Sequence, residues 1–438
     1  MCYAIPGKVT EIKDKVITVD YFGEKRKAKN DFYELAPGDY VYAQGGLVIQ
    51  KISEEEAIPI LETWREYFFK LQETDLRLAH NPKTLYQTAN SIRQKHLGNA
   101  CCVHGIIEFS NYCRNNCLYC GIRKDNAKLK RYRMGVDEIL AVAENAVNKL
   151  GFKAIVLQSG EDMWYDGDKL ADITAKIRER CPALLVWSIG ERDTGTYKRM
   201  YAAGARGVLL RFETADSQQY ARLKPGQSIE GRVELIESLR DMGYLIFTGF
   251  LVGLPGQEEK DILGNIEMTN SLGAEMFSFG PFIPHPETPF ADASPPSVEL
   301  ALTTIARARI LYPEAKILVT TAMETIAGEN GMKQGLLSGG NSLMINLTPQ
   351  EYRALYEIYP GREIASAAPR NDRVGRGIAS AAPRNDRVGR EIASAAPRND
   401  RVGREIASAA PRNDITGKIN SVIELLKSIG RAPTDIGI

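Results

Sequence analysis

The chain has 438 residues, of which 44% are hydrophobic and 25% are charged. This length predicts two or more domains, and the composition is typical of a soluble globular protein. With 56 Lys and Arg against 55 Asp and Glu, the net charge of +1 gives no electrostatic case for a nucleic acid or an anionic membrane as partner.

The start of the chain and its cysteines indicate a compartment. The first residues show no basic start followed by an apolar run, and no apolar stretch is long enough to span a bilayer. The seven cysteines are odd in number and clustered, which argues against a disulfide framework and for metal-binding thiols in reducing surroundings. We therefore expect a cytoplasmic protein.

Residues 1 to 75 are expected to form a small β-barrel and a following helix, and residues 76 to 103 a helical linker. Short runs of β-forming residues separated by Gly and charged turns predict the barrel. Ser53 with Glu56 three positions later is typical of a capping box at a helix start. The expected strands are Lys8–Ile12, Val16–Tyr21 and Tyr40–Ile52, and the expected helices are Glu54–Thr74 and Lys83–His96.

The N-terminal segment resembles the HypC/HupF family of NiFe-hydrogenase chaperones. The resemblance rests on MCYAIPGKV and on GDYVYAQGGLVIQKISEEEA at 38–57. In that family the Cys after Met1 ligates iron once the Met is removed, and here that residue is Cys2. The family's usual Val-His pair is Ala43-Gln44 in this chain, so the His is absent. The resemblance leaves two readings open: iron transfer at Cys2, or a barrel that serves only for docking.

Residues 104 to 360 alternate between strand and helix patterns. Eight strands with intervening helices predict a parallel (β/α)₈ barrel, with an open doubly wound sheet as the alternative. The expected strands are Val103–Phe109, Ala154–Gln158, Leu184–Ile189, Gly207–Phe212, Tyr244–Val252, Met276–Ile283, Ile317–Thr321 and Ser342–Leu347. Amphipathic helices between them include Asp137–Leu150, Lys169–Arg180, Arg232–Met242 and Val298–Leu311.

The string CRNNCLYC follows the first barrel strand and carries the strongest chemical signal. It places Cys113, Cys117 and Cys120 on one loop at the carboxyl end of that strand, where barrel enzymes build their sites. Three thiolates can hold three irons of a cubane cluster and leave the fourth iron for a small molecule. The alternative is a three-Cys zinc site with a distant fourth ligand.

This region resembles the radical S-adenosylmethionine (SAM) superfamily and, in particular, the HydE family of FeFe-hydrogenase maturases. The motif is CxxxCxxC with an aromatic residue before the last Cys. The longer matching strings are EFSNYCRNNCLYCGIRKDN, LKRYRM, VLQSGED, LLRFETAD, GLPGQ, GPFIPHPETP, TTAM and YEIYPG, with IELLKSIGRAP near the end of the chain. Biotin synthase and methylornithine synthase share the cluster motif but fit these strings less well. The resemblance implies a 4Fe–4S cluster and SAM as cofactors.

The resemblance also implies residue roles. Ser159, Gly160 and Glu161 should line the amino end of SAM, and Glu213 and Arg232 match SAM-contacting positions. A guanidinium suits a carboxylate because it can donate two hydrogen bonds.

A second implied set faces the cavity and is assigned to substrate: Arg211, Thr320, Thr321 and Tyr356. The alternatives are structural salt bridges for the arginines and ordinary strand packing for the threonines. The family string RHET reads Arg211-Phe212-Glu213-Thr214 here, so its His is missing. His285, like the other three histidines, is not predicted to be catalytic.

The implied activity is reductive cleavage of SAM to a 5′-deoxyadenosyl radical in assembly of the FeFe-hydrogenase diiron site. The implied substrate is an organometallic iron species with CO and cyanide, and the implied partners are hydrogenase maturation proteins and a ferredoxin or flavodoxin as electron donor. The alternatives are a radical SAM enzyme acting on a small amino acid or sulfur compound, and a non-enzymatic scaffold that binds iron through Cys2.

Residues 361 to 414 repeat a 14-residue unit, GREIASAAPRNDRV, which recurs almost letter for letter from Gly375, Gly389 and Gly403 and stops at Asp414. The unit is short, charged and poor in large apolar residues, so we expect a disordered insertion. Residues 415 to 438 are expected to form a helix, Ile419–Ile429, and a tail. No Cys lies in either segment, so a second cluster is not expected, and Cys101, Cys102 and Cys181 should pack as small apolar groups.

Overall fold

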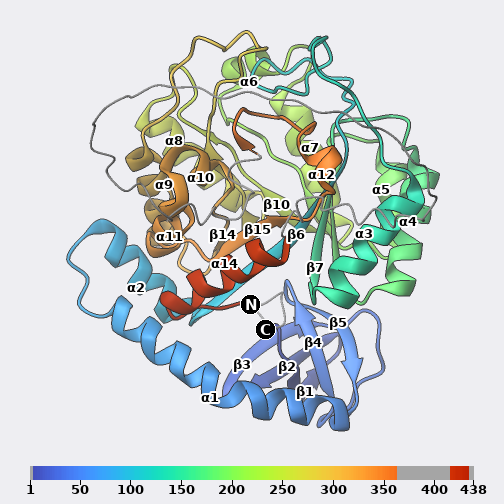
Figure 1. Cartoon of the computed structure of the whole chain (residues 1–438), viewed down its shortest axis with the longest axis vertical. Coiled ribbons are helices and arrows are strands. Elements are labelled where there is room, and N and C mark those ends of the chain that lie inside the picture. The colour runs from blue at the N-terminus through green and yellow to red at the C-terminus, as the bar shows by residue number, and fades with distance from the viewer. Residues whose placement is uncertain (1–2, 363–414, 434–438) are drawn as a thin grey trace, which may run out of the picture.

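The computed structural model describes residues 3–362 and 415–433 and contains a small barrel and a large barrel, linked by two helices (Figure 1). Among these residues, no helix is both long and apolar enough to cross a bilayer. The repeat tract, from 363 to 414, and Cys2 lie outside the described residues.

The small barrel is closed and five-stranded, in the order β1-β2-β3-β5-β4. Its strands are β1 (Gly7–Lys13), β2 (Val16–Tyr21), β3 (Glu24–Lys29), β4 (Tyr40–Gln44) and β5 (Leu47–Ile52). The predicted barrel is confirmed, with two corrections. Tyr40–Ile52 is a hairpin rather than one strand, because Gly45 and Gly46 turn the chain with φ of 57° and 77°. The strand β3 was not predicted.

Two helices follow, α1 (Glu54–Ala79) and α2 (Leu85–Leu97). The capping box is confirmed, since the Ser53 hydroxyl accepts a hydrogen bond from the Glu56 amide at 3.2 Å and the Glu56 carboxylate accepts one from the Ser53 amide at 3.0 Å. Trp64, Phe68 and Leu71 of α1 pack against the core of the small barrel. Through these contacts the small barrel and α1 form one packed unit. The helix ends at Ala79, four residues beyond the expected boundary at residue 75.

The large barrel has eight parallel strands in the order β14-β12-β10-β9-β8-β7-β6-β15. Its two ends meet at a parallel bridge between Leu318 and Ser342, which confirms the (β/α)₈ architecture over the open sheet. The strands are β6 (Ala100–Ser110), β7 (Ala154–Ser159), β8 (Leu184–Ser188), β9 (Gly207–Leu209), β10 (Leu245–Thr248), β12 (Ala274–Phe277), β14 (Lys316–Ile317) and β15 (Ser342–Asn346). The expected strands Tyr244–Val252 and Met276–Ile283 are each broken, and their second halves form the separate pair β11 (Leu251–Val252) and β13 (Gly280–Pro281).

Helices surround this barrel (Figure 1). They are α3 (Val136–Glu144), α4 (Gly167–Arg180), α5 (Thr194–Ala202), α6 (Ser217–Leu223), α7 (Ile229–Asp241), α8 (Glu259–Ser271), α9 (Val298–Leu311), α10 (Ala322–Ala327), α11 (Gly331–Leu337) and α12 (Gln350–Arg353).

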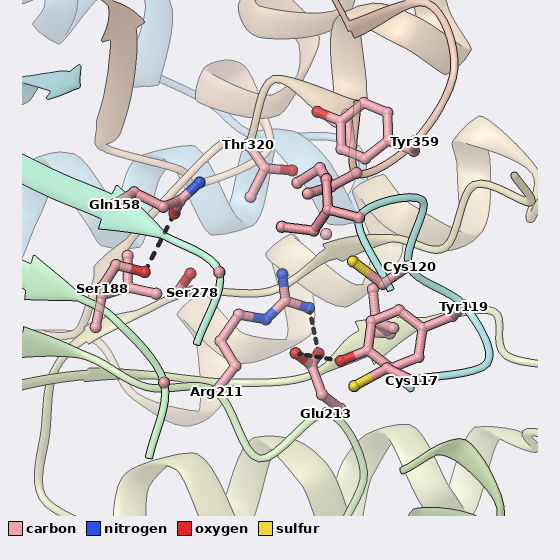
Figure 2. A pocket seen from close by; sticks show the side chains of 18 of the residues that line it. Cys117, Tyr119, Cys120, Gln158, Ser188, Arg211, Glu213, Ser278, Thr320 and Tyr359 are labelled. Carbon is pink, nitrogen blue, oxygen red and sulfur yellow. Dashed lines mark hydrogen bonds and ion pairs between the residues drawn. The ribbon is translucent and has the colours of Figure 1, made fainter. Parts of the chain in front are cut away.

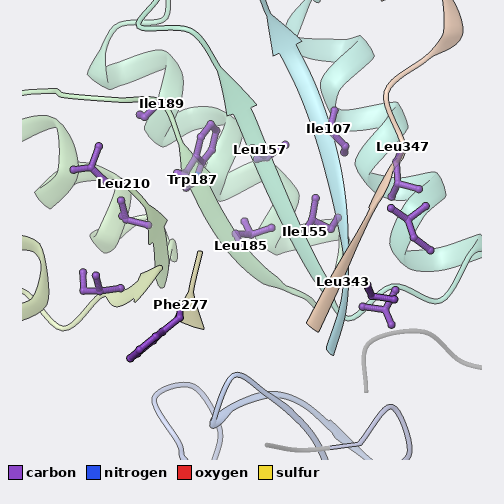
Figure 3. Close-up of a cluster of buried hydrophobic side chains, with 14 of the residues drawn as sticks. Ile107, Ile155, Leu157, Leu185, Trp187, Ile189, Leu210, Phe277, Leu343 and Leu347 are labelled. Carbon is purple, nitrogen blue, oxygen red and sulfur yellow. The ribbon is translucent and has the colours of Figure 1, made fainter. Parts of the chain in front are cut away.

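The side chains of the barrel strands alternate between two cores, as the two-residue period of a strand requires. On β7 and β8 the set that packs against the helices is Ile155, Leu157, Leu185 and Trp187 (Figure 3). The set that fills the barrel interior is Ala154, Val156, Leu184 and Val186. The next inward positions along the two strands are Gln158 and Ser188, which are polar and line a cavity. The interior is therefore apolar toward the strand starts and polar at the carboxyl ends.

The hairpin β4–β5 of the small barrel closes the amino end of the large barrel. Tyr42, Leu47 and Ile49 join the same apolar cluster as the inward side chains at the strand starts. Gly45 is required at the tip, because a Cβ there would lie 2.9 Å from the Leu184 side chain. We call this contact the hairpin plug. It places the small barrel at the end of the large barrel opposite the polar cavity.

The end of the chain returns to this junction. Helix α14 (Ile415–Ser428) packs into the core of the large barrel, and β16 (Ala432–Pro433) pairs in parallel with the start of β6. Gly361 approaches Thr325, and Lys418 donates a hydrogen bond to Glu324 at 2.8 Å. Because Thr325 and Glu324 are neighbours on α10, the two ends that flank the repeat tract are anchored at one place.

A buried ion cluster ties this C-terminal segment to the linking helices. The Asp75 carboxylate of α1 accepts hydrogen bonds from Arg93 of α2 at 2.6 and 2.7 Å and from Arg431 at 3.2 Å. All three side chains are almost fully buried. Burial, together with the charge of Arg93, lowers the pKa of Arg431 to about 10. One carboxylate thus balances two buried guanidinium groups.

Candidate functional site

The three motif cysteines lie on the loop that follows β6, and all three line one cavity of about 300 Å³. The loop is fixed by backbone hydrogen bonds to the surrounding rim. The Leu118 amide donates to the Leu223 carbonyl at 2.9 Å, and the Gly121 amide donates to the Ile358 carbonyl at 3.0 Å. The sequence-predicted grouping of Cys113, Cys117 and Cys120 around one space is therefore present in the structure.

Burial raises the pKa of all three thiols, that of Cys117 to about 11. Burial keeps these thiols protonated unless a bound metal ion stabilises the thiolate, which is the form that ligates a metal. Within the described part of the chain, no three His, Cys, Asp or Glu side chains are grouped closely enough to hold a single metal ion. Three soft donors around one cavity fit an iron–sulfur cluster, in which each thiolate binds a different iron.

Ser159, Gly160 and Glu161 end strand β7 and line the same cavity. Gly160 allows the cysteine loop to approach, because a Cβ at this position would lie 2.3 Å from the Tyr112 carbonyl oxygen. The Glu161 carboxylate already accepts hydrogen bonds from Arg114 at 3.0 Å and from the Glu191 amide at 2.9 Å. Its side chain is thus committed to shaping the loop, and the backbone of this segment is the freer acceptor.

Arg211, Glu213 and Tyr119 form a linked group on the cavity wall (Figure 2). The Arg211 guanidinium lies 3.0 Å from one oxygen of Glu213, and the Tyr119 hydroxyl donates to the other at 3.2 Å. Glu213 has φ of 66°, a strained conformation for a residue with a side chain. Hydrogen bonds to the Gly249 carbonyl at 3.1 Å and from the Leu251 amide at 2.9 Å hold it there. Strain of this kind is typical of functional sites.

Arg232, at the first turn of α7, combines a structural and a free contact. Its Nε donates to Glu191 at 2.7 Å and its Nη1 donates to the Arg211 carbonyl at 2.9 Å. Its Nη2 is buried without a hydrogen-bond partner. The expected alternative, a structural salt bridge, is therefore present, yet one nitrogen remains for a ligand in the cavity.

Lys224 also lines the cavity and was not predicted from the sequence. It caps the C-terminus of α6, directly after Leu223, whose carbonyl holds the cysteine loop. Burial and the neighbouring Arg232 lower its pKa, while Cys117 and Glu213 oppose that shift. No motif marks this residue, because its position depends on how α6 returns to the cysteine loop.

The predicted substrate residues Thr320, Thr321 and Tyr356 line the same cavity as the cysteines. The Thr320 hydroxyl is buried without a partner, whereas that of Thr321 forms a 2.7 Å hydrogen bond with the Tyr359 hydroxyl. Further polar residues of the wall were missed: Gln158, Ser188, Ser278, Tyr359 and Arg362. The inward period of β7 and β8 would have indicated Gln158 and Ser188, which bond to each other at 3.2 Å (Figure 2).

Other predicted positions lie away from this cavity. Cys101, Cys102 and Cys181 are buried, as expected for small apolar groups. His285 is buried, its Nδ1 accepts from the Glu287 amide at 3.1 Å, and it is not among the residues that line the cavity.

Comparisons with known proteins cover both barrels. Residues 107–268 match the radical SAM superfamily, and residues 1–64 match the HupF/HypC family. The chain is 42% identical over 280 residues to the [FeFe] hydrogenase maturase subunit HydE of Thermotoga maritima, covering 64% of this chain and 80% of that protein. It is 28% identical to the 3-methylornithine synthase of Methanosarcina acetivorans, over 65% of this chain and 81% of that protein. A crystal structure of methylornithine synthase superposes with a TM-score of 0.54 at 26% identity, over 63% of this chain and 85% of the other.

Proposed function

The chain belongs to the radical SAM superfamily and, within it, to the family of the hydrogenase maturase HydE, and from this premise we propose that it cleaves SAM during assembly of a hydrogenase diiron site. Membership implies a 4Fe–4S cluster and SAM as its cofactors. One observation carries the proposal. Three thiols, the carboxylate of Glu213, whose backbone is strained, and the two buried cations Lys224 and Arg232 line a single cavity at the carboxyl ends of the barrel strands. Barrel enzymes place their chemistry at this end.

Cys113, Cys117 and Cys120 are proposed to hold three irons of the cluster and to leave the fourth iron open. Once bound there, the cluster would supply the one electron that cleaves SAM into methionine and a 5′-deoxyadenosyl radical. The protein's contribution is to position the reactants and exclude water. The apolar side chains of Ile106 and Leu318 line the floor of the cavity and also belong to the core behind the hairpin plug, so solvent is excluded from below.

The cations and acceptors divide the cavity into two ends. Arg232, through its free Nη2, and Lys224 are proposed to bind the SAM carboxylate, because both are buried cations that line the cavity and Lys224 lies near Cys117. The SAM ammonium requires acceptors, which Glu213 and the backbone from Ser159 to Glu161 supply. Arg211, Thr320, Thr321 and Tyr356, which line the same cavity, are proposed to bind the substrate, for which an organometallic iron species is the family analogy.

The likeness to 3-methylornithine synthase supports a second candidate, a radical SAM reaction on an amino acid. Arg211 with Thr320 would suit a substrate carboxylate in that case. The first test applies to both candidates: the reconstituted protein, reduced with dithionite, should convert SAM to methionine and 5′-deoxyadenosine. Absence of cleavage with a fully loaded cluster would leave the non-enzymatic scaffold. Formation of 3-methylornithine from an amino acid added to the assay would favour the amino-acid reaction over maturation.

Replacing Arg232 by Ala is expected to weaken SAM binding about ten- to hundredfold, because a charge-assisted hydrogen bond contributes about 1.5–3 kcal/mol. Iron loading should be unchanged, since Arg232 bonds to Glu191 and Arg211 but to no cysteine. The measurement is the SAM dissociation constant by equilibrium dialysis, with the melting temperature as a check on folding. Arg232→Lys keeps the charge but not the fork geometry, so it should restore only part of the affinity. An unchanged dissociation constant in a folded Arg232→Ala protein would refute the role.

Iron binding at Cys2 stays a proposal. Tyr3, the first described residue, is buried in the small barrel, at the end of the molecule opposite the cavity. We therefore predict that Cys2→Ala leaves SAM cleavage in vitro unchanged and lowers hydrogenase maturation in cells. The comparison of the two assays on the same variant is the measurement. Full maturation with Cys2→Ala would favour the docking reading, and loss of SAM cleavage would contradict the separation of the two ends.

A further inference from the structure

Three large apolar side chains are exposed together beside the cysteine loop. Tyr112, Met163 and Trp164 have 36%, 52% and 45% of their surface exposed. The Arg133 guanidinium lies 3.7 Å from the centre of the Tyr112 ring and 5.8 Å from the centre of the Trp164 ring, so it joins the loops that follow β6 and β7. We call these four residues the rim patch. Clusters of Trp, Tyr and Arg are typical of the centres of protein–protein interfaces.

The rim patch is held in place from below by the buried Asp162. Its carboxylate accepts two hydrogen bonds from Arg133, at 2.6 and 2.9 Å, one from the Ser110 hydroxyl at 2.7 Å and one from the Trp164 amide at 3.1 Å. The Met163 sulfur contacts Arg192 at 2.7 Å. Side chains fixed in this way lose little freedom when a partner binds, which favours affinity.

The charge around the rim patch is positive, although the chain as a whole is nearly neutral. Residues 112–133 contain seven Lys or Arg and one acidic residue, Asp125. Lys124 and Lys130 are exposed, and no ion pair involves either among the described residues. The segment 130–133 lies antiparallel beside 110–112, through the bridge between Ser110 and Arg133, so it brings Lys130 to the edge of the patch. The nearby acidic side chains are paired: Asp166 with Lys169, Asp168 with Arg199 and Glu191 with Arg232.

The patch is also next to the proposed cluster site. Tyr112 precedes Cys113, and its carbonyl packs on Gly160, whose neighbour Glu161 donates its amide to the Cys113 sulfur at 3.4 Å. A protein seated on the patch would therefore cover the outer side of the first thiol. Electron transfer to the site requires such proximity, and the proposed reaction consumes one electron for each SAM.

We propose that the rim patch, with Lys130, docks a small acidic protein that carries single electrons. This inference rests on the proposed function. The reduced partner loses one electron, and the site of the three cysteines gains it. The exposed aromatic groups supply the central contact, and Lys130 attracts the partner's carboxylates and accelerates encounter at low salt.

The test uses the holoenzyme with two probes, a reduced flavodoxin and a reduced 4Fe–4S ferredoxin. Trp164→Ala and Lys130→Glu are the variants. Phe69→Ala, with 45% of its surface exposed on α1, and Lys13→Glu, an exposed lysine of the small barrel, are the matched controls. Dissociation constants come from titration, and SAM cleavage is measured with each protein donor and with dithionite.

We expect the dissociation constant to rise about tenfold for Trp164→Ala and about three- to tenfold for Lys130→Glu, the usual range for interface anchors and charges. The effect of Lys130→Glu should shrink as salt is added. Dithionite-driven cleavage should be unchanged in both variants. The proposal is overturned if both probes bind the variants as tightly as wild type, if the controls lose equal affinity, or if dithionite-driven cleavage falls by the same factor. If the wild type itself fails to cleave SAM with dithionite, the proposed function fails, whereas the binding result still decides the docking surface.

Discussion

Replacing Cys113, Cys117 or Cys120 by Ala is expected to abolish iron–sulfur loading and SAM cleavage together. Each thiol is the only protein ligand proposed for its iron, and no other cysteine within residues 3–362 and 415–433 lines the cavity. The loop itself should stay folded, because backbone bonds such as Leu118 to Leu223 hold it in place. Iron and sulfide content per chain, the electron paramagnetic resonance signal of the reduced protein and 5′-deoxyadenosine formation are the measurements.

The matched control is Cys181→Ala, which removes a buried thiol that does not line the cavity. This variant should load iron and cleave SAM as the wild type does, with only a modest loss of stability. The assignment would be contradicted if any one of these three variants, Cys113→Ala, Cys117→Ala or Cys120→Ala, still carried a full cluster and still cleaved SAM. Equal losses in Cys181→Ala would show instead that any cysteine change unfolds the barrel.

Replacing Asp75 by Ala should lower the free energy of unfolding by about 3–5 kcal/mol, because it leaves two buried guanidinium groups without a carboxylate. Arg93 and Arg431 are almost fully buried and cannot turn to solvent without opening the contact between α1, α2 and the C-terminal segment. The measurement is the shift in the denaturant midpoint of the apo-protein.

The control for this change is Asp168→Ala, whose side chain is 90% exposed and pairs only with Arg199 at the surface. Exposed ion pairs contribute about 0–1 kcal/mol, so this midpoint should hardly move. A loss below about 1 kcal/mol for Asp75→Ala would contradict the view that the cluster ties the C-terminal segment to the barrel.

The sequence predicts the large barrel well because its strands repeat one pattern, a buried apolar run followed by a polar residue at the carboxyl end. It fails at β3, whose sequence EKRKAK carries four basic residues and buries only Ala28. A strand so polar gives no hydrophobic period to detect. The hairpin β4–β5 was taken as one strand because apolar residues continue on both sides of Gly45 and Gly46, although this dipeptide is a known hairpin signal.

The site residues likewise fall into those that the sequence predicts and those that it does not. The cysteines and the end of β7 are consecutive in sequence, so a motif identifies them. Lys224, Tyr359 and Arg362 come from a helix end and from the segment after α12, and they reach the cavity only because those loops return to the barrel mouth. The pairing of Arg232 with Glu191 likewise depends on the contact between α7 and the loop after β8. Such tertiary contacts leave no periodic trace in the chain.

The hairpin plug has a consequence for how the protein is made. The small barrel leaves the ribosome first, but the surface that receives Tyr42, Leu47 and Ile49 includes Met344 on the last barrel strand. At about 5–20 residues per second, the roughly 300 intervening residues take on the order of 15–60 s to synthesise. Throughout that interval the surface that receives the apolar hairpin is incomplete. Biogenesis should therefore depend on chaperones that shield the nascent chain. The yield of folded protein should improve at moderate temperature with added chaperones.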